Sequence, residues 1–178
     1  MDNEMERLKY PVGRFVWPAE VSADELKEAI SIIGALPAKL RNVIDGLDER
    51  QLNTTYRDGG WTVRQVVHHI ADSHMNAMIR FKLALSEDMP TVKPYDETAW
   101  GNHIDATTIS PEHSLRIIEG VHARWVVLMQ NMSEADWNRK YNHPQYGTFE
   151  LKKVARQYSW HSEHHLGHVM IVINAFSV

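Results

Sequence analysis

Hydrophobic residues recur at helical spacing in four long stretches of the chain. The first covers residues 23–47 and the second 63–85. The third begins at Ser110 and reaches about residue 132, and the fourth runs from about Thr148 almost to the C-terminus. In each stretch the apolar positions repeat every three or four residues, which places them on one face of a helix. Four amphipathic helices in one small chain predict an all-α four-helix bundle.

Three of these stretches begin with helix-start signals. Ser22 followed by Glu25, and Thr62 followed by Gln65, both have the spacing of a capping box. The third stretch opens with Ser110-Pro111-Glu112, which is an N-cap, a first-turn proline and an acid at the positive end of the helix. These signals fix where the helices are expected to start.

The segments between the helices determine how the helices are connected and in which direction each one runs. Pro37 predicts a kink or a break in the first helix. Residues 1–21 contain two prolines and a glycine and are expected to be an irregular lead-in. The link 86–109 is long enough to cross the bundle from end to end, so the second and third helices are expected to run parallel. The link 132–147 has turn-forming residues, which predict turns or a small hairpin.

Composition sets the class of protein. The chain has 178 residues, which predicts a single domain over residues 1–178. Its net charge of −4 disfavours nucleic acid as a partner. It has no cysteine, which excludes disulfides, thiolate metal sites and a cysteine nucleophile. The apolar runs are too short for a membrane span. The N-terminus is acidic and polar, so no signal peptide is expected and a cytoplasmic location is the default.

Histidine is the unusual residue, with 11 in the chain. His161, His165 and His168 occupy consecutive core positions of the fourth helix, where leucine or isoleucine is usual. Because a buried imidazole needs partners for both nitrogens, three on one stripe favour a metal site. The alternative is three core histidines that bond to serine, asparagine or backbone groups.

The second helix offers a further ligand among His68, His69 and His74. Helical periodicity places His74 near the middle of the apolar stripe and His68 well outside it. His69 falls about 120° from the centre of the stripe, on a polar strip. That strip also holds Ser73, Asn76 and Arg80. Spacing alone does not decide which histidine is the ligand.

The remaining histidines are weaker candidates. His122 is expected to be a satisfied structural residue, and His164 points away from the core positions. The last three, in loops or a first helical turn, are expected at the surface: His103, His113 and His143.

Sharper catalytic motifs are absent from the sequence. No His-Glu-x-x-His occurs, and only residues 119–122 fit the Glu-x-x-His spacing that a di-iron site would need twice. No nucleophile elbow, P-loop or dinucleotide fingerprint is present.

Two blocks of sequence are distinctive: residues 57–74, which include Gly-Gly-Trp-Thr, and residues 158–165. Shorter blocks lie at 94–100 and 122–125. Together these blocks resemble the YfiT-type proteins of the DinB-like superfamily, over nearly the whole chain. The resemblance implies a bundle with up-down-down-up order. It also implies a divalent metal held by three histidines, one from the second helix and two from the fourth. Carried over, these are His69, His161 and His165, which sets aside His74; no general acid or base follows.

The resemblance implies a metal-dependent hydrolase in which an open coordination position activates water. An alternative is a thiol S-transferase that uses a low-molecular-weight thiol such as bacillithiol or mycothiol. A second alternative is a non-catalytic bundle stabilised by a metal, with His168 or His74 as a fourth protein ligand.

The expected cofactor is one divalent ion, with zinc favoured by the imidazole ligands and nickel also compatible. The substrate is expected to be a small molecule, and relatives of this type are often homodimers. Four residues are candidates to orient a ligand or the substrate: Glu163, Asp72, Asn76 and His168.

Overall fold

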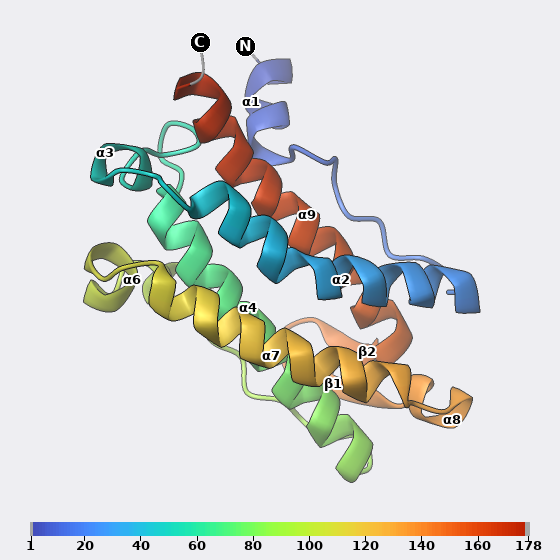
Figure 1. Ribbon diagram of the computed structural model, residues 1–178. Coiled ribbons are helices and arrows are strands. Elements are labelled where there is room, and N and C mark those ends of the chain that lie inside the picture. The colour runs from blue at the N-terminus through green and yellow to red at the C-terminus, as the bar shows by residue number, and fades with distance from the viewer. Residues whose placement is uncertain (1, 177–178) are drawn as a thin grey trace.

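Four long helices form a bundle in the computed structural model, which describes residues 2–176, with side chains from Glu4 onward. They are α2 (Ala23–Ile44), α4 (Val63–Ser86), α7 (Glu112–Gln130) and α9 (Leu151–Phe176). Helix α2 packs against α7 and α9, and α4 packs against the same two, so the four surround one interior. Helices α4 and α7 run in one direction and α2 and α9 in the other (Figure 1), which is the expected up-down-down-up order.

Shorter elements fill the connections. The crossover between α4 and α7 contains α5 (Glu97–Gly101) and α6 (Ile104–Thr108), and α3 (Glu49–Leu52) precedes α4. Helix α8 (Glu134–Trp137) leads into an antiparallel hairpin of β1 (Lys140–His143) and β2 (Gly147–Glu150). The hairpin predicted from the turn residues is therefore present, and Gly147 supplies its positive φ of 83°.

The predicted capping boxes are both present. The backbone N–H of Glu25 donates to the Ser22 hydroxyl and Ser22 N–H donates to the Glu25 carboxylate, and Thr62 and Gln65 repeat the pattern. Helix α7 begins one residue later than expected, at Glu112, whose N–H donates to the Ser110 hydroxyl. A kink or a break was predicted at Pro37, and the break does not form, because helix α2 continues through this residue. Buried residues on either side, including Leu36 and Leu40, hold the helix against its neighbours.

Three further boundaries differ from the sequence-based expectation. The lead-in 1–21 is not irregular throughout, because α1 (Asp2–Lys9) forms within it; Met1 lies outside the described residues. Helix α9 starts at Leu151, because the hairpin takes up Thr148. Helix α2 ends at Ile44, and Gly46 with φ of 82° turns the chain away. Each difference comes from a contact with a distant segment or a turn, which the periodicity does not contain.

Helix α1 and the turn after it dock on α9 at a glycine. A Cβ on Gly167 would lie 2.8 Å from Cγ of Pro11, so only glycine permits this approach. At the end of α1, the carbonyl of Lys9 lies 3.2 Å from Nε2 of His168. The N-terminal helix is thus tied to the inner face of α9, although its own sequence is largely polar.

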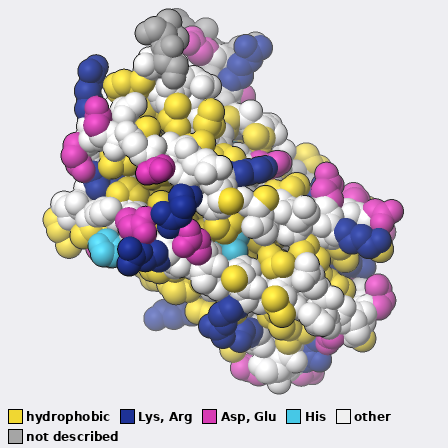
Figure 2. All heavy atoms as spheres, in the orientation of Figure 1, with side chains coloured by type: hydrophobic (Ala, Val, Ile, Leu, Met, Phe, Trp, Pro, Cys, Tyr) yellow, Lys and Arg dark blue, Asp and Glu magenta, His cyan; other side chains and the backbone are white. Residues whose placement is uncertain are grey.

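The bundle interior holds two apolar clusters with histidine side chains between them. One cluster includes Phe81 and Trp125, and the other includes Ile70 and Ile118. Between them lies a set of imidazoles that we call the histidine layer: His69, His74, His122, His161, His165 and His168. On the face shown in Figure 2, acidic and basic side chains are interspersed and little histidine surface is visible, in agreement with this burial. Within the described part of the chain, no helix combines the length and apolar character needed to cross a membrane.

Replacing Gly167 with alanine should loosen α1 without unfolding the bundle. The new Cβ collides with the Pro11 ring, and the rigid ring must move away. We expect hydrogen-exchange protection of residues 4–10 to fall by about tenfold or more while that of α4 and α7 is retained. As a control, Gly120→Ala has nothing within 4 Å of the new Cβ. It should stabilise the protein by about 0.5–1 kcal/mol through helix propensity. Unchanged protection in Gly167→Ala would contradict the docking.

Candidate metal centre

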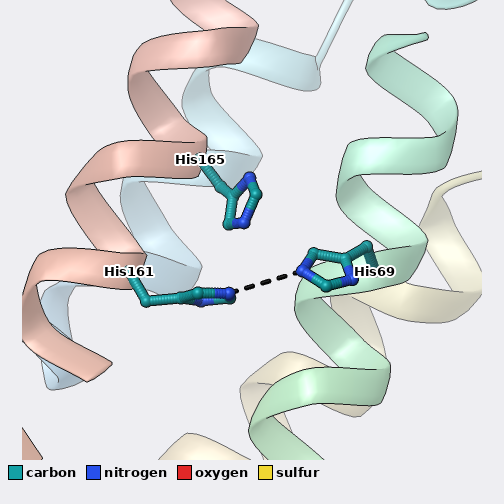
Figure 3. Close-up of side chains that lie close together, drawn as sticks. All are labelled: His69, His161 and His165. Atoms are coloured by element: carbon teal, nitrogen blue, oxygen red, sulfur yellow. Dashed lines mark hydrogen bonds between the residues drawn. The ribbon is translucent and has the colours of Figure 1, made fainter. Parts of the chain in front are cut away.

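Three histidine rings from two helices converge in the middle of the bundle. His69 comes from α4, and His161 and His165 come from successive turns of α9 (Figure 3). One ring nitrogen from each lies within 4.8 Å of the other two. Nε2 of His69 and Nε2 of His161 are 3.3 Å apart. The spacing of four residues on α9 explains the pairing, because such side chains lie one above the other.

This arrangement fits a divalent metal ion. Two imidazole nitrogens bound to one tetrahedral zinc at about 2.0–2.1 Å would lie about 3.3–3.4 Å apart. The separation of His69 and His161 agrees with that edge. An all-imidazole donor set suits zinc, copper, iron or nickel rather than magnesium or calcium. The three residues could therefore hold one ion and leave coordination positions for other ligands.

Burial keeps these three imidazoles neutral. Burial lowers the pKa of His69 to about 4, with a smaller contribution from nearby His168. The pKa values of His161 and His165 are also lowered well below the usual range, again mainly by burial and then by the neighbouring imidazoles. A metal ligand must offer a lone pair, so the rings are in the required state at neutral pH.

Two hollows reach the candidate site, the first at all three histidines and the second at His161 alone. The first hollow has a volume of about 560 Å³, and its lining includes all three histidines with Trp61, Arg57 and Trp160. The second hollow, of about 620 Å³, has His161 in its lining together with Arg80, Tyr141 and Tyr158. Glu97 and Thr98 line both. Small molecules therefore have space on each side of His161.

Of the four residues predicted to orient a metal-binding histidine or the substrate, only His168 contacts one of the three histidines. Its Nδ1 lies 3.3 Å from Nδ1 of His165. Glu163 is exposed to solvent on α9. Asp72 is half-buried near Asp105; burial, reinforced by that second carboxylate, raises its pKa to about 6. Asn76 donates to the backbone oxygen of Asp72 at 2.8 Å. Neither Asp72 nor Asn76 is among the residues that line the two hollows.

His74 is fully buried, as its place in the apolar stripe predicts, but it does not join the group of three. Its Nε2 lies 3.0 Å from Nδ1 of His161, and its Nδ1 lies 2.8 Å from Nε2 of His122. His122 is a satisfied core residue, as expected, with Nδ1 2.6 Å from the carbonyl oxygen of Ile33. Sequence reasoning missed the contact between His74 and His161, although both occupy core positions of helices that pack together.

Three other histidines are more buried than the sequence suggests. His68 contacts the Ser114 hydroxyl at 2.7 Å, because α7 and the crossover cover it. His143 was expected at the surface but is buried in β1 of the hairpin. His164 is also buried, with its ring stacked on Trp160. The two remaining residues are exposed as expected: His103 and His113.

Comparison with known proteins identifies the family. Residues 33–169 match the model of the DinB superfamily. The chain belongs to the DinB superfamily.

Relatives with assigned names and a solved structure extend this result. A protein of Oceanobacillus iheyensis named "Putative metal-dependent hydrolase" is 45% identical over 161 residues, which cover 90% of this chain and 93% of the relative. YfiT of Bacillus subtilis, which carries the same descriptive name, is 41% identical over 91% of this chain and 92% of its own.

The solved structure of YfiT, described as a four-helix bundle of unusual topology, matches with a TM-score of 0.93. The match has 39% identity and covers 96% of this chain and 98% of YfiT. A mycothiol-dependent maleylpyruvate isomerase shares the fold at a TM-score of 0.59 and 18% identity, over 78% of this chain and 60% of its own. At that identity the isomerase shows the fold alone.

Zinc titration of single variants tests the ligand set. We expect one ion per chain, and His69→Ala, His161→Ala and His165→Ala should each weaken binding by more than about 100-fold. That loss exceeds the 10–100-fold typical of residues that only support a ligand. His113→Ala, on the exposed face of α7, is the control and should bind zinc like the unmodified chain. Retained affinity in any of the three alanine variants would remove that residue from the set.

Proposed function

We propose that the protein is a metal-dependent hydrolase whose ion, zinc by preference, is held by His69, His161 and His165. The observation that carries the proposal is the convergence of three neutral imidazoles, two buried and His161 half-buried, where a hollow meets all three and a second hollow meets His161. The names of relatives above 40% identity point to the same class of activity. A small-molecule substrate, a homodimeric assembly and a cytoplasmic location remain part of this proposal.

The chain's own residues set up the chemistry. When bound, the ion would supply Lewis acidity, which lowers the pKa of a water molecule to near neutral pH and polarises a carbonyl group. His161 and His165 present their nitrogens from one rigid helix, and His69 closes the group from the facing helix. Burial of the rings lowers the local dielectric, which strengthens electrostatic stabilisation of developing charge. Trp61 lies 4.6 Å from the His69 ring and shields one side of the site.

A closed, purely structural metal site is less well supported. It would need a fourth protein ligand, for which His74 and His168 are the nearest candidates. Both rings already have a partner at each nitrogen: His74 contacts His161 and His122, and His168 contacts His165 and the Lys9 carbonyl. This favours a three-histidine site with room for substrate.

The second hollow suits a substrate that carries an anionic group. Half-buried Arg80 lines it beside Tyr141 and Tyr158. None of the ion pairs among the described residues includes Arg80. The carboxylates that share this lining, Asp96 and Glu97, are solvent-exposed. A guanidinium with no carboxylate partner is a ready binding group for a carboxylate or phosphate.

Activity on a panel of esters, amides and phosphoesters tests the proposed reaction. Hydrolysis should disappear after chelation, return with zinc, and fall by about 100-fold or more in His161→Ala, because the ion loses a ligand. The same preparations should be given bacillithiol or mycothiol with an electrophile. Turnover in the thiol assay but on none of the hydrolysis substrates would replace the hydrolase with a thiol S-transferase.

Arg80→Gln tests the substrate side separately. For hydrolysed substrates with a carboxylate or phosphate, the KM should rise by about 10–100-fold, as expected for losing a charge-assisted hydrogen bond. The KM for neutral substrates should stay unchanged. The exposed Arg124→Gln on α7 is the matched control for loss of one positive charge. An equal rise for charged and neutral substrates would contradict an anion-binding role for Arg80.

A further inference from the structure

A series of hydrogen bonds begins at His161, leads away from the other two candidate ligands, and ends on a backbone carbonyl. Nδ1 of His161 contacts Nε2 of His74 at 3.0 Å, and Nδ1 of His74 contacts Nε2 of His122 at 2.8 Å. The series ends where Nδ1 of His122 meets the carbonyl oxygen of Ile33 at 2.6 Å. The planes of the His74 and His122 rings are only 6° apart, which suits an in-plane hydrogen bond.

The carbonyl at the end determines the direction of every bond. A carbonyl oxygen can only accept, so Nδ1 of His122 carries the hydrogen. In a neutral ring the other nitrogen is then an acceptor, so His122 accepts from Nδ1 of His74. By the same step His74 accepts at Nε2 from Nδ1 of His161. The nitrogen left with a lone pair is Nε2 of His161, the one that faces His69.

These bond directions hold when the rings are neutral, and the surroundings of the rings keep them neutral. His74 and His122 are fully buried, and His161 is largely enclosed by other rings. The partners in the series are imidazoles and one backbone oxygen, with no carboxylate to stabilise an imidazolium. An unpaired charge in such a place is costly, so the neutral form prevails.

A shorter series of hydrogen bonds fixes the position of the hydrogen on His165, the second candidate ligand on α9. Nε2 of His168 lies 3.2 Å from the carbonyl oxygen of Lys9, and Nδ1 of His168 lies 3.3 Å from Nδ1 of His165. Since the Lys9 carbonyl accepts, His168 accepts in turn from His165, whose Nε2 keeps its lone pair. Tyr56 stacks on His168 with ring centroids 3.9 Å apart and holds the ring in place.

We propose that His74 and His122, and in parallel His168, are positioning residues that fix the tautomers of His161 and His165. They hold a hydrogen on each Nδ1, so that both Nε2 lone pairs point toward His69. This proposal rests on the metal site of the proposed function but not on the reaction it performs. Without these residues each ligand could place its hydrogen on Nε2, and in that tautomer Nε2 has no lone pair for the metal.

The residues of the shorter series could instead form a second metal site. Nitrogens of His164, His165 and His168 also lie within 4.8 Å of one another, close enough to hold an ion. An ion there would need the lone pairs that the hydrogen bond between His165 and His168 uses. The two interpretations differ in stoichiometry, because a second site predicts two zinc ions per chain and the proposed series predicts one.

Nitrogen-15 NMR of the full chain, with and without zinc, reads the tautomers directly. In the zinc-free protein we expect His161 and His165 to carry hydrogen on Nδ1 and to show an unprotonated Nε2. On zinc addition Nε2 should shift while the Nδ1 hydrogen is retained. Hydrogen on Nε2 of His161 in the zinc-free protein would overturn the proposal without any variant, and two bound zinc ions would overturn the role of His168.

Two substitutions at His122 provide a matched pair. His122→Leu removes the acceptor for His74, so His161 should become a mixture of tautomers and zinc affinity should fall by about 10–100-fold. His122→Gln places an amide oxygen near the former Nε2 position and should bind zinc within about threefold of the unmodified chain. Circular dichroism checks that both variants fold. If folded His122→Leu keeps the tautomer and the affinity, the positioning role is wrong.

Discussion

A buried imidazole must find a partner for each of its two nitrogens, and this constraint organises the centre of the bundle. The histidine layer brings six such rings into the interior. Neighbouring rings satisfy many of the nitrogens, and backbone carbonyls of Ile33 and Lys9 satisfy the ends. The layer therefore works only when α2, α4, α7, α9 and the end of α1 all meet at this level. The three candidate ligands, His69, His161 and His165, are therefore part of the hydrogen-bonded core.

The two apolar clusters make this polar layer tolerable. Phe81 and Trp125 on one side, and Ile70 and Ile118 on the other, supply the hydrophobic burial that stabilises the helix packing. On α7, His122 stands between Ile118 and Trp125, so one helix contributes to both clusters and to the layer. Stability and chemistry are thus separated along the bundle axis, which allows imidazoles in the middle at limited cost to folding.

The sequence predicts well what is local and poorly what depends on covering segments. The capping boxes at Ser22 and Thr62 and the periodic apolar faces located the helices, because those signals lie within the helices themselves. Helix α1 was missed because its sequence is polar and its docking depends on the fit of Pro11 against Gly167. His68 was misplaced for the same reason, since its cover comes from the crossover and from Ser114 on α7.

The candidate site shows the limit of periodicity as a guide to ligands. Periodicity finds the most enclosed histidine of α4, which is His74. The proposed ion, with open coordination positions, needs a ligand beside a hollow, and His69 lines the first hollow. Only the resemblance pointed to His69, and its polar strip agrees, because Ser73 and Arg80 line the second hollow. The most buried histidine is then the one best placed to support a ligand from behind. A reactive imidazole site therefore pairs a ligand at the wall of a hollow with a satisfied imidazole in the core.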